Sequence, residues 1–186
     1  MRAKSTALSI VSAFLVLCVF AGNFKGGKKR TKKCRVSGTV VHMAAYCGGA
    51  RMPDEFLNDL TKPKPFSTKK LYVMKGKING FDAKPFLVFI SDSLGHFSIV
   101  LPAGDYCIVD EFKRDKKYYD SILETYRIET ENYSAVDPVC LKGWFEMPDA
   151  VFTVTKAGLK DLTIVYTDKC PWNSIPCVMY KGPLPP

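Results

Sequence analysis

The chain has 186 residues with 27 Lys and Arg against 18 Asp and Glu, so its formal net charge is +9. Nine of the basic residues precede Val36, and the 18 that follow balance all 18 acidic residues. The balanced part lacks the broad basic surface that a nucleic-acid-binding protein needs for phosphate contacts. It holds about 150 residues, enough for one domain with its own hydrophobic core.

The first 21 residues have the pattern of an export signal. Arg2 and Lys4 precede an apolar run over residues 7–21, which is short for a transmembrane helix. We therefore predict a signal peptide over 1–21, cleaved after Ala21, and a protein that is exported to the periplasm or the cell surface.

A basic segment follows the signal, and it leaves two alternatives open. We predict a flexible linker over 22–35, whose Lys and Arg residues at 25–35 can hold the protein peripherally against an anionic membrane surface or glycan. Positive residues after an apolar run also resist translocation, so an uncleaved N-terminal membrane anchor is one alternative. Lipidation at Cys18 is the other, although Leu17 stands where a lipobox requires a small residue.

Beyond the linker, the sequence has the pattern of a β protein. Alternating or β-branched and aromatic runs predict strands over 35–45, 70–75, 85–91, 96–101, 105–112, 150–155 and 159–167. The run 85–91 is apolar on both faces, which predicts a central strand. Phe97, Ile99 and Leu101 are expected to point into the core together. The dipeptide Asn79-Gly80 predicts a tight turn.

Two segments have helical patterns. A proline followed by two acidic residues predicts a short helix over 53–60, and apolar residues at helical spacing predict another over 115–127. The second helix belongs to an insertion at about 113–139. Residues 132–148 are expected to be irregular, and the Pro-rich stretch 170–177 to form a closed loop.

Short strands with tight turns predict one domain over 36–186. We expect a mainly β fold, an antiparallel Greek-key β-sandwich of about seven strands with a short helical insertion.

A resemblance supports this fold. An acidic residue, Gly95, Phe97, Leu101-Pro102-Ala103-Gly104 and Tyr106 follow one another in an order that resembles the carboxypeptidase regulatory-like domain, a transthyretin-like β-sandwich. Gly38-Thr39-Val40 is similar to the opening strand of that family. The chain is also similar to small exported proteins of Bacteroidetes. The resemblance implies the sandwich fold and a non-catalytic role.

An even number of cysteines in an exported chain indicates disulfide bonds. After the signal, the chain contains Cys34, Cys47, Cys107, Cys140, Cys170 and Cys177. Cys34 and Cys47 lie at opposite ends of one predicted strand, too far apart to pair. We expect Cys107 to pair with Cys140, because the two flank the helical insertion. Cys170 and Cys177 could close the Pro-rich loop, which would leave Cys34 and Cys47 free or in intermolecular bonds. Six cysteines allow fifteen pairings, and the sequence alone does not choose among them.

No motif of the sequence indicates a cofactor or a catalytic site, so we assign no cofactor and no catalytic residue, and we expect no enzyme activity. A metal site would require His42, Cys47 and His96 to converge, at a spacing unlike that of ordinary zinc motifs. We expect instead that His96 faces solvent beside a turn and that His42 is solvent-facing or at a strand edge.

Three aromatic residues are candidates for ligand contact. Trp144, Phe145 and Trp172 lie in segments expected to be irregular, where aromatic faces can stack on sugars, although burial against the sandwich is the alternative.

The function expected first is that of a non-catalytic exported β-sandwich protein with a structural, adhesion or ligand-binding role at the cell envelope, whose partner is an unidentified protein or glycan. One alternative is an envelope protein that handles metal or redox chemistry through a Cys/His site. The other is a glycan or small-ligand binder that uses the loop aromatics.

Overall fold

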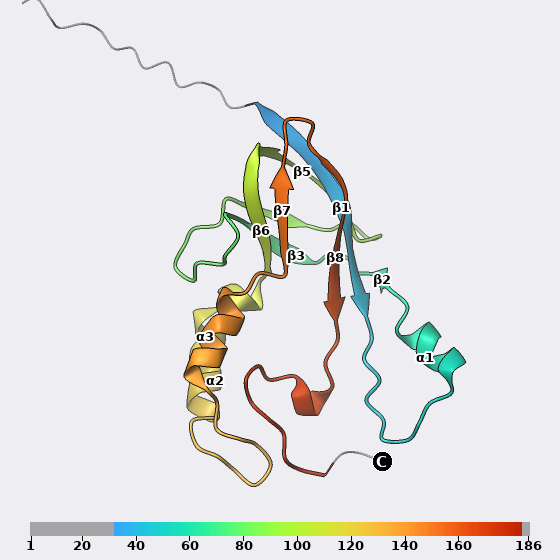
Figure 1. Cartoon of the computed structure of the whole chain (residues 1–186), viewed down its shortest axis with the longest axis vertical. Coiled ribbons are helices and arrows are strands. Elements are labelled where there is room, and N and C mark those ends of the chain that lie inside the picture. The colour runs from blue at the N-terminus through green and yellow to red at the C-terminus, as the bar shows by residue number, and fades with distance from the viewer. Residues whose placement is uncertain (1–31, 184–186) are drawn as a thin grey trace, which may run out of the picture. The chain divides into compact units, whose positions relative to one another are not determined.

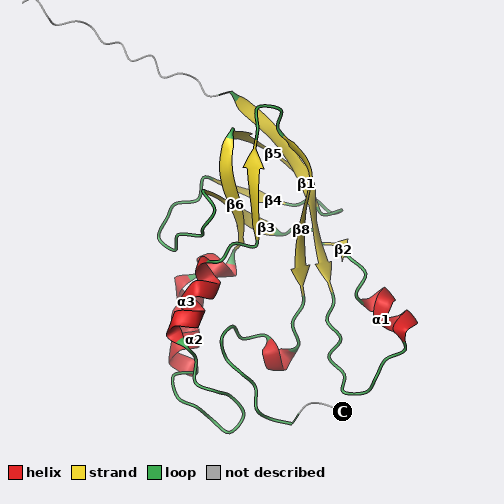
Figure 2. Cartoon of the chain, in the orientation of Figure 1, coloured by secondary structure: helices red, strands yellow, loops and turns green. Residues whose placement is uncertain are grey.

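The computed structural model describes residues 32–183, which form two four-stranded sheets packed on each other (Figure 1 and Figure 2). The expected mainly β sandwich with a short helical insertion is therefore confirmed. In the first sheet, β1 (Lys33–Met43) is central. It pairs antiparallel with β5 (His96–Pro102) and with the two-residue β2 (Lys64–Pro65). On its other side it pairs parallel with β8 (Leu159–Thr167).

The second sheet is antiparallel throughout. Its order is β4 (Leu87–Ile90), β3 (Lys70–Lys75), β6 (Gly104–Asp110) and β7 (Ala150–Val154). A tight turn after β7 then carries the chain across to β8 in the first sheet, closed by the bridge between Thr155 and Gly158.

The parallel pairing of β1 with β8 differs from the fully antiparallel sandwich that we expected. The two strands approach each other so closely that a Cβ atom at Gly38 would overlap the backbone carbonyl of Leu162. The register shifts between Val36 and Gly38 at this point. A residue with a side chain at position 38 would therefore separate β8 from β1.

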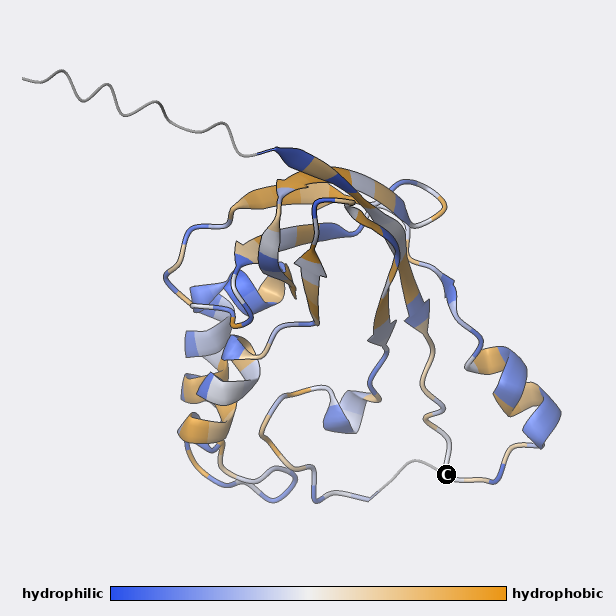
Figure 3. Ribbon diagram, turned by 45° about the horizontal axis from the view of Figure 1, so that its top comes forward, coloured by the Kyte–Doolittle hydropathy of each residue, from blue (hydrophilic) through white to orange (hydrophobic). Residues whose placement is uncertain are grey.

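The main core lies between the two sheets. Phe97, Ile99 and Leu101 are at most 7 % exposed, whereas Ser98 and Val100 face outward, so the predicted orientation of this strand is confirmed. The banding along the strands in Figure 3 shows the same alternation of hydrophobic and hydrophilic residues. The fully buried aliphatic residues of this core are Val36, Val40, Leu71, Val73, Leu101 and Ile108.

The prediction of a central strand over 85–91 is wrong. β4 lies at the edge of the second sheet, and its outward residues Val88 and Ile90 are 42 % and 61 % exposed. Only Leu87 and Phe89 pack on the core. A run that is apolar on both faces indicates burial on both faces only when another layer covers the outside of the sheet.

The helices agree with the sequence in part. α1 (Asp54–Leu60) and α2 (Lys116–Thr125) lie within the predicted segments. α3 (Pro138–Glu146) lies where we expected irregular structure. Its start has a recognisable signal, since the Asp137 side chain accepts hydrogen bonds from two backbone N–H groups of the first turn and a proline follows it.

A second hydrophobic cluster forms around these helices. α2 and α3 lie together beyond one end of β6 and β7 (Figure 1). The 3₁₀ turn η1 (Phe112–Arg114) contacts both helices, and a second 3₁₀ turn, η2 (Pro171–Asn173), lies in the C-terminal segment. The buried members of the cluster are Ile122, Val136, Leu141, Phe145 and Val178. The insertion thus has a core of its own.

The disulfide bonds join Cys47 to Cys170 and Cys140 to Cys177. The expected pairing of Cys107 with Cys140 is therefore wrong, and Cys170 and Cys177 do not pair with each other. Cys107 is buried on the outer face of the second sheet with Met74 and Val109, whereas Cys140 lies on α3 beside the C-terminal segment. Cys170 bonds to the loop that follows β1, and Cys177 bonds to α3.

Of the segments predicted before the sandwich, the structure describes only the last residues of the linker. β1 begins at Lys33, so the predicted linker 22–35 is too long, and Cys34 is a buried core residue that is not in a disulfide bond. The signal or anchor over 1–21 and most of the basic tail lie outside the described residues. In the described part of the chain, no helix is long and apolar enough to cross a membrane.

Candidate functional site

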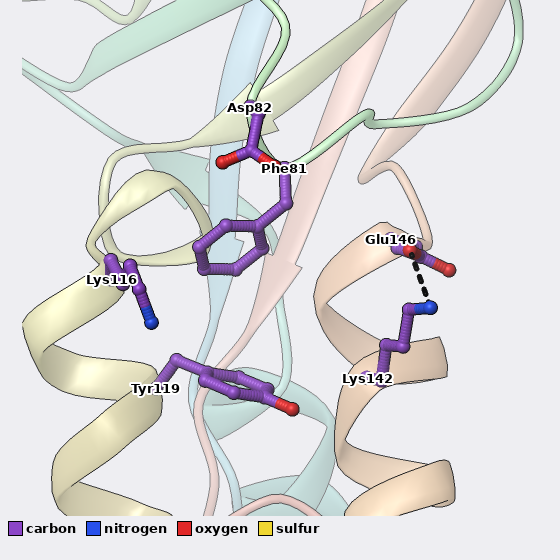
Figure 4. Close-up of a pocket in the computed structure, with 6 residues that line it drawn as sticks. All are labelled: Phe81, Asp82, Lys116, Tyr119, Lys142 and Glu146. Atoms are coloured by element: carbon purple, nitrogen blue, oxygen red, sulfur yellow. Dashed lines mark ion pairs between the residues drawn. The ribbon is translucent and has the colours of Figure 1, made fainter.

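A pocket of about 220 Å³ lies between α2, α3 and the loop from β3 to β4 (Figure 4). The loop, α2 and α3 each contribute two lining residues, which are Phe81, Asp82, Lys116, Tyr119, Lys142 and Glu146. The pocket therefore belongs to the helical insertion and to the loop that contacts it.

Two aromatic rings line the pocket. The rings of Phe81 and Tyr119 meet edge to face, with centroids 5.4 Å apart. Behind them, Phe145 contacts Tyr119 at 5.1 Å and Phe81 at 5.6 Å. Phe145 itself is fully buried. Its predicted role in ligand contact is thus corrected, because it supports the two rings from the core of the insertion.

Charged side chains surround these rings. Lys142 and Glu146 lie 3.8 Å apart on α3, the pair marked in Figure 4, and Lys116 hydrogen-bonds Asp120 at 2.9 Å. The hydrogen bond to Asp120 raises the pKa of Lys116. Exposed ion pairs of this kind contribute little to stability, so these charges can exchange partners with a polar ligand at little cost.

Asn79 holds the loop against the end of α3. It is fully buried, its side chain donates to the carbonyl of Phe145 at 2.7 Å, and its backbone N–H donates to the carbonyl of Glu146 at 3.0 Å. The last carbonyls of a helix have no hydrogen-bond donor within the helix, and Asn79 supplies a donor to two of them. The tight turn predicted at Asn79-Gly80 is not formed, because Asn79 binds α3 instead.

Arg114 holds the same loop from its other side. Its guanidinium donates to the side-chain oxygen of Asn79 at 3.1 Å and to the carbonyl of Gly80 at 2.6 Å. It also donates to the carbonyl of Ala83. These bonds position Phe81 and Asp82, which lie between the anchored residues. No motif or spacing in the sequence indicates this role of Arg114.

A buried ion pair connects η1 to the short segment between α3 and β7. Lys113 and Asp149 are 2.7 Å apart, and their side chains are only 5 % and 12 % exposed. Lys113 also donates to the carbonyl of Met147 at 3.0 Å, and Asp149 accepts from the backbone N–H of Asp110 at 2.6 Å. Breaking such a pair by removing one partner costs about 3–5 kcal/mol, so it holds the end of α3 in place.

A second ion pair lies beside it. Lys69 Nζ is 2.6 Å from Asp110 Oδ2, which is buried and makes no hydrogen bond of good geometry. Burial raises the pKa of Asp110, against the lowering effect of Lys69. The Tyr166 hydroxyl donates to Asp149 at 3.3 Å, and burial together with that carboxylate raises the pKa of Tyr166. Every charge of this cluster has a partner, which indicates a structural role.

The two tryptophans take different positions. Trp144 stacks on Phe112, with ring centroids 5.9 Å apart, and Lys113 and Lys169 lie over its ring at 4.7 and 5.4 Å. Trp172 is half-buried in η2 and makes no ring contact with Trp144 within the described residues. The three aromatic candidates therefore do not form one site.

The candidate metal ligands do not meet. Cys47 is bonded to Cys170, His42 lies 3.8 Å from Asp168, and His96 faces solvent 3.7 Å from Asp92. Between residues 32 and 183, no three His, Cys, Asp or Glu side chains are arranged to hold a metal ion. The expected position of His96 agrees with the structure. His42 is instead half-buried on the central strand β1, between β2 and β8, and its ring packs on that of Phe66 with centroids 5.3 Å apart, so the solvent-facing or edge position expected for it is wrong.

Cys107 is poorly suited to nucleophilic chemistry. Burial, helped by Asp149, raises the pKa of its thiol to about 11. A thiol of this kind stays protonated at neutral pH, and only the thiolate is a good nucleophile.

Comparison with known proteins leaves the site to be judged on its own geometry. No family model matches the chain, and no curated protein or solved structure matches it. The resemblance to the carboxypeptidase regulatory-like domain therefore stays a prediction from the sequence.

Proposed function

We propose that the protein is an exported, non-catalytic binding protein of the cell envelope, with a saccharide as the ligand of the pocket between α2 and α3. The observation that carries the proposal is the cross-linked wall of this pocket. α3 supplies Lys142 and Glu146, and the bond between Cys140 and Cys177 ties α3 to the C-terminal segment. A site that is ordered before the ligand arrives binds more tightly, because less conformational entropy is lost.

The lining of the pocket favours a sugar over an apolar ligand. The rings of Phe81 and Tyr119 offer faces and edges on which the C–H groups of a sugar can pack. Two lysines and two carboxylates around them offer hydrogen-bond donors and acceptors for hydroxyl groups. A small number of polar groups around an apolar surface is the usual composition of a small-molecule site.

The disulfide bonds support the location. Two bonds in one chain indicate an oxidising environment, since cytosolic thiols are kept reduced. Together with the signal predicted over 1–21, they favour an exported protein at the periplasm or cell surface.

Ligand binding is tested with purified protein on a glycan array and by titration of the sugars that score. We expect Tyr119→Ala to weaken binding at least tenfold, while Tyr119→Phe keeps the ring and retains most of it. Phe56→Ala serves as the matched control, because Phe56 is an exposed aromatic residue on α1, outside the pocket. Weaker binding supports the site if Tyr119→Ala unfolds at the same temperature as the wild type. Binding that is unchanged in Tyr119→Ala would contradict the pocket as the site.

Export is tested separately in the producing cell. We expect fractionation to recover the protein outside the cytoplasm and N-terminal sequencing to begin at Gly22. An intact Met1 on protein that is protected inside the cytoplasm would overturn the proposed location.

A further inference from the structure

β4 leaves one side of the second sheet open. It pairs with β3, and within residues 32–183 no strand pairs with its other side. The N–H of Ser91 donates to the carbonyl of Lys69 at 3.0 Å. In an antiparallel ladder, alternate residues bond to the same neighbour, so Phe89 also bonds to β3. The backbone groups of Val88 and Ile90 then point outward, where a further strand would lie.

The outer side of this edge is apolar along β4 itself. Exposed edge strands commonly carry a charge or a proline, and here Lys84 and Pro85 stand directly before the run 86–90 rather than inside it. Every side chain of the run is apolar, and Val88 and Ile90 are 42 % and 61 % exposed. The edge thus offers both hydrogen-bonding groups and an apolar surface.

The charges at the two ends of the strand indicate what pairs with it. Lys84 precedes the strand and Asp92 follows it, and both are exposed. A second copy in antiparallel orientation brings the basic end of each strand beside the acidic end of the other, whereas a parallel copy would bring like charges together. β7, at the opposite edge of this sheet, starts instead beside Asp149, whose charge is already paired with Lys113.

We propose that β4 is a dimerisation edge, at which it pairs antiparallel with β4 of a second copy about a two-fold axis at Val88. In this register Val88 faces its own counterpart, and the N–H of Ile90 faces the carbonyl of Phe86 of the other copy. The N–H of Phe86 takes no part, because it donates to the carbonyl of Val73 within its own chain. The second sheet becomes continuous across the two copies. The pairing does not involve the pocket between α2 and α3, so it stands apart from the ligand-binding proposal.

The test measures the mass of the purified protein by light scattering after gel filtration, over a series of concentrations. We expect wild type to shift toward twice the mass of one chain as its concentration rises. Val88→Lys places two like charges opposite each other at the axis, so this variant should keep the mass of one chain. Val151→Lys is the matched control, because Val151 is 49 % exposed on β7, and it should behave as wild type.

A charge change at the start of the strand separates pairing from general loss of stability. Lys84→Glu places like charges beside each other and should weaken the dimer, whereas Lys84→Arg keeps the charge and should not. Asp92 is left unchanged, because its side chain accepts from the backbone N–H groups of Leu94 and His96 in the same chain. Wild type that stays at the mass of one chain at its highest soluble concentration would overturn the proposal. A dimer that survives Val88→Lys, or that is lost equally in Val151→Lys, would overturn it too.

Discussion

At the scale of single residues, Asn79 connects the β3–β4 loop to α3. Its side chain and backbone satisfy two carbonyls at the end of the helix, and it has no exposed surface. An alanine at this position would leave the Phe145 carbonyl without its donor in a place that water does not reach.

We expect Asn79→Ala to lower the free energy of unfolding by about 1–3 kcal/mol, the cost of an unsatisfied buried polar group. Urea denaturation measures this. Asn58→Ala, at an exposed position of α1, is the control and should change stability by less than about 0.5 kcal/mol. Equal effects of the two substitutions would show that Asn79 does not anchor the loop.

The buried carboxyl of Asp110 should make the free energy of unfolding depend on pH. Burial raises its pKa in the folded protein. A carboxyl with a raised folded pKa binds its proton more tightly when folded, so its stabilising contribution is present below its ordinary pKa of about 4 and is lost as pH rises through the folded value. We therefore expect the stability of Asp110→Asn, relative to wild type, to improve as pH rises above about 4.

The neighbouring Glu111 is the control for this experiment. It is exposed, and its hydrogen bond with Lys70 lowers its pKa. Its contribution is present above its ordinary pKa and is lost on acidification, so Glu111→Gln should lose stability relative to wild type as pH rises. Urea denaturation at a series of pH values measures both variants. Trends of the same sign in the two variants would contradict the assignment.

At the scale of the element, β5 shows how far a local pattern can be trusted. The alternation over 96–101 predicted which side chains face the core, and the structure places them there. The same reasoning wrongly predicted a central position for β4, because the sequence of one strand does not show whether another layer covers its outer face.

Ile99→Ala should lower the free energy of unfolding by about 2–5 kcal/mol, since it removes a buried side chain and leaves a cavity. Ser98→Ala, on the opposite face of β5, should cost little. Chemical denaturation of both variants gives the comparison. Similar mild effects would mean that the strand faces the other way.

α3 depends on the bond that holds it to the C-terminal segment. The bond between Cys140 and Cys177 spans 37 positions, and closing a loop of that length stabilises by about 4 kcal/mol in the chain-entropy model. We expect the double variant Cys140→Ser/Cys177→Ser to lose about that much and to exchange the amide hydrogens of α3 faster than those of β5. Exchange that is unchanged in α3 would show that packing alone orders the helix.

At the scale of the whole molecule, the two disulfide bonds fasten the C-terminal segment at two points. Cys170 bonds to the segment that leaves β1, 123 positions earlier, and Cys177 bonds to α3. Cys34 and Cys107 remain as buried thiols. The last part of the chain therefore connects the sandwich to its helical insertion.

This arrangement predicts the reactivity of the cysteines. Digestion without reduction should yield one peptide pair with Cys47 and Cys170 and another with Cys140 and Cys177. Cys34 and Cys107 should resist alkylation in the folded protein and react after unfolding, since both are buried and the pKa of Cys107 is raised to about 11. Rapid labelling of Cys107 in the folded state, or its recovery bonded to Cys140, would refute the assignment.

Local patterns in the sequence were enough to predict the fold class, the positions of most strands and the helices α1 and α2. These follow from periodicity, turn residues and helix starts, which act over a few neighbouring residues. α3 was also within reach, because Asp137 and Pro138 form an ordinary helix start. The even number of cysteines likewise indicated disulfide bonds, although not their partners.

Long-range packing, by contrast, sets the disulfide partners, the edge position of β4 and the pocket. Each depends on residues far apart in the chain that packing brings together. Cys47 meets Cys170 across 123 positions, and Phe81 meets Tyr119 because Asn79 and Arg114 hold the loop against α3. Local patterns carry no information on such meetings, since many arrangements of the same elements satisfy them equally well.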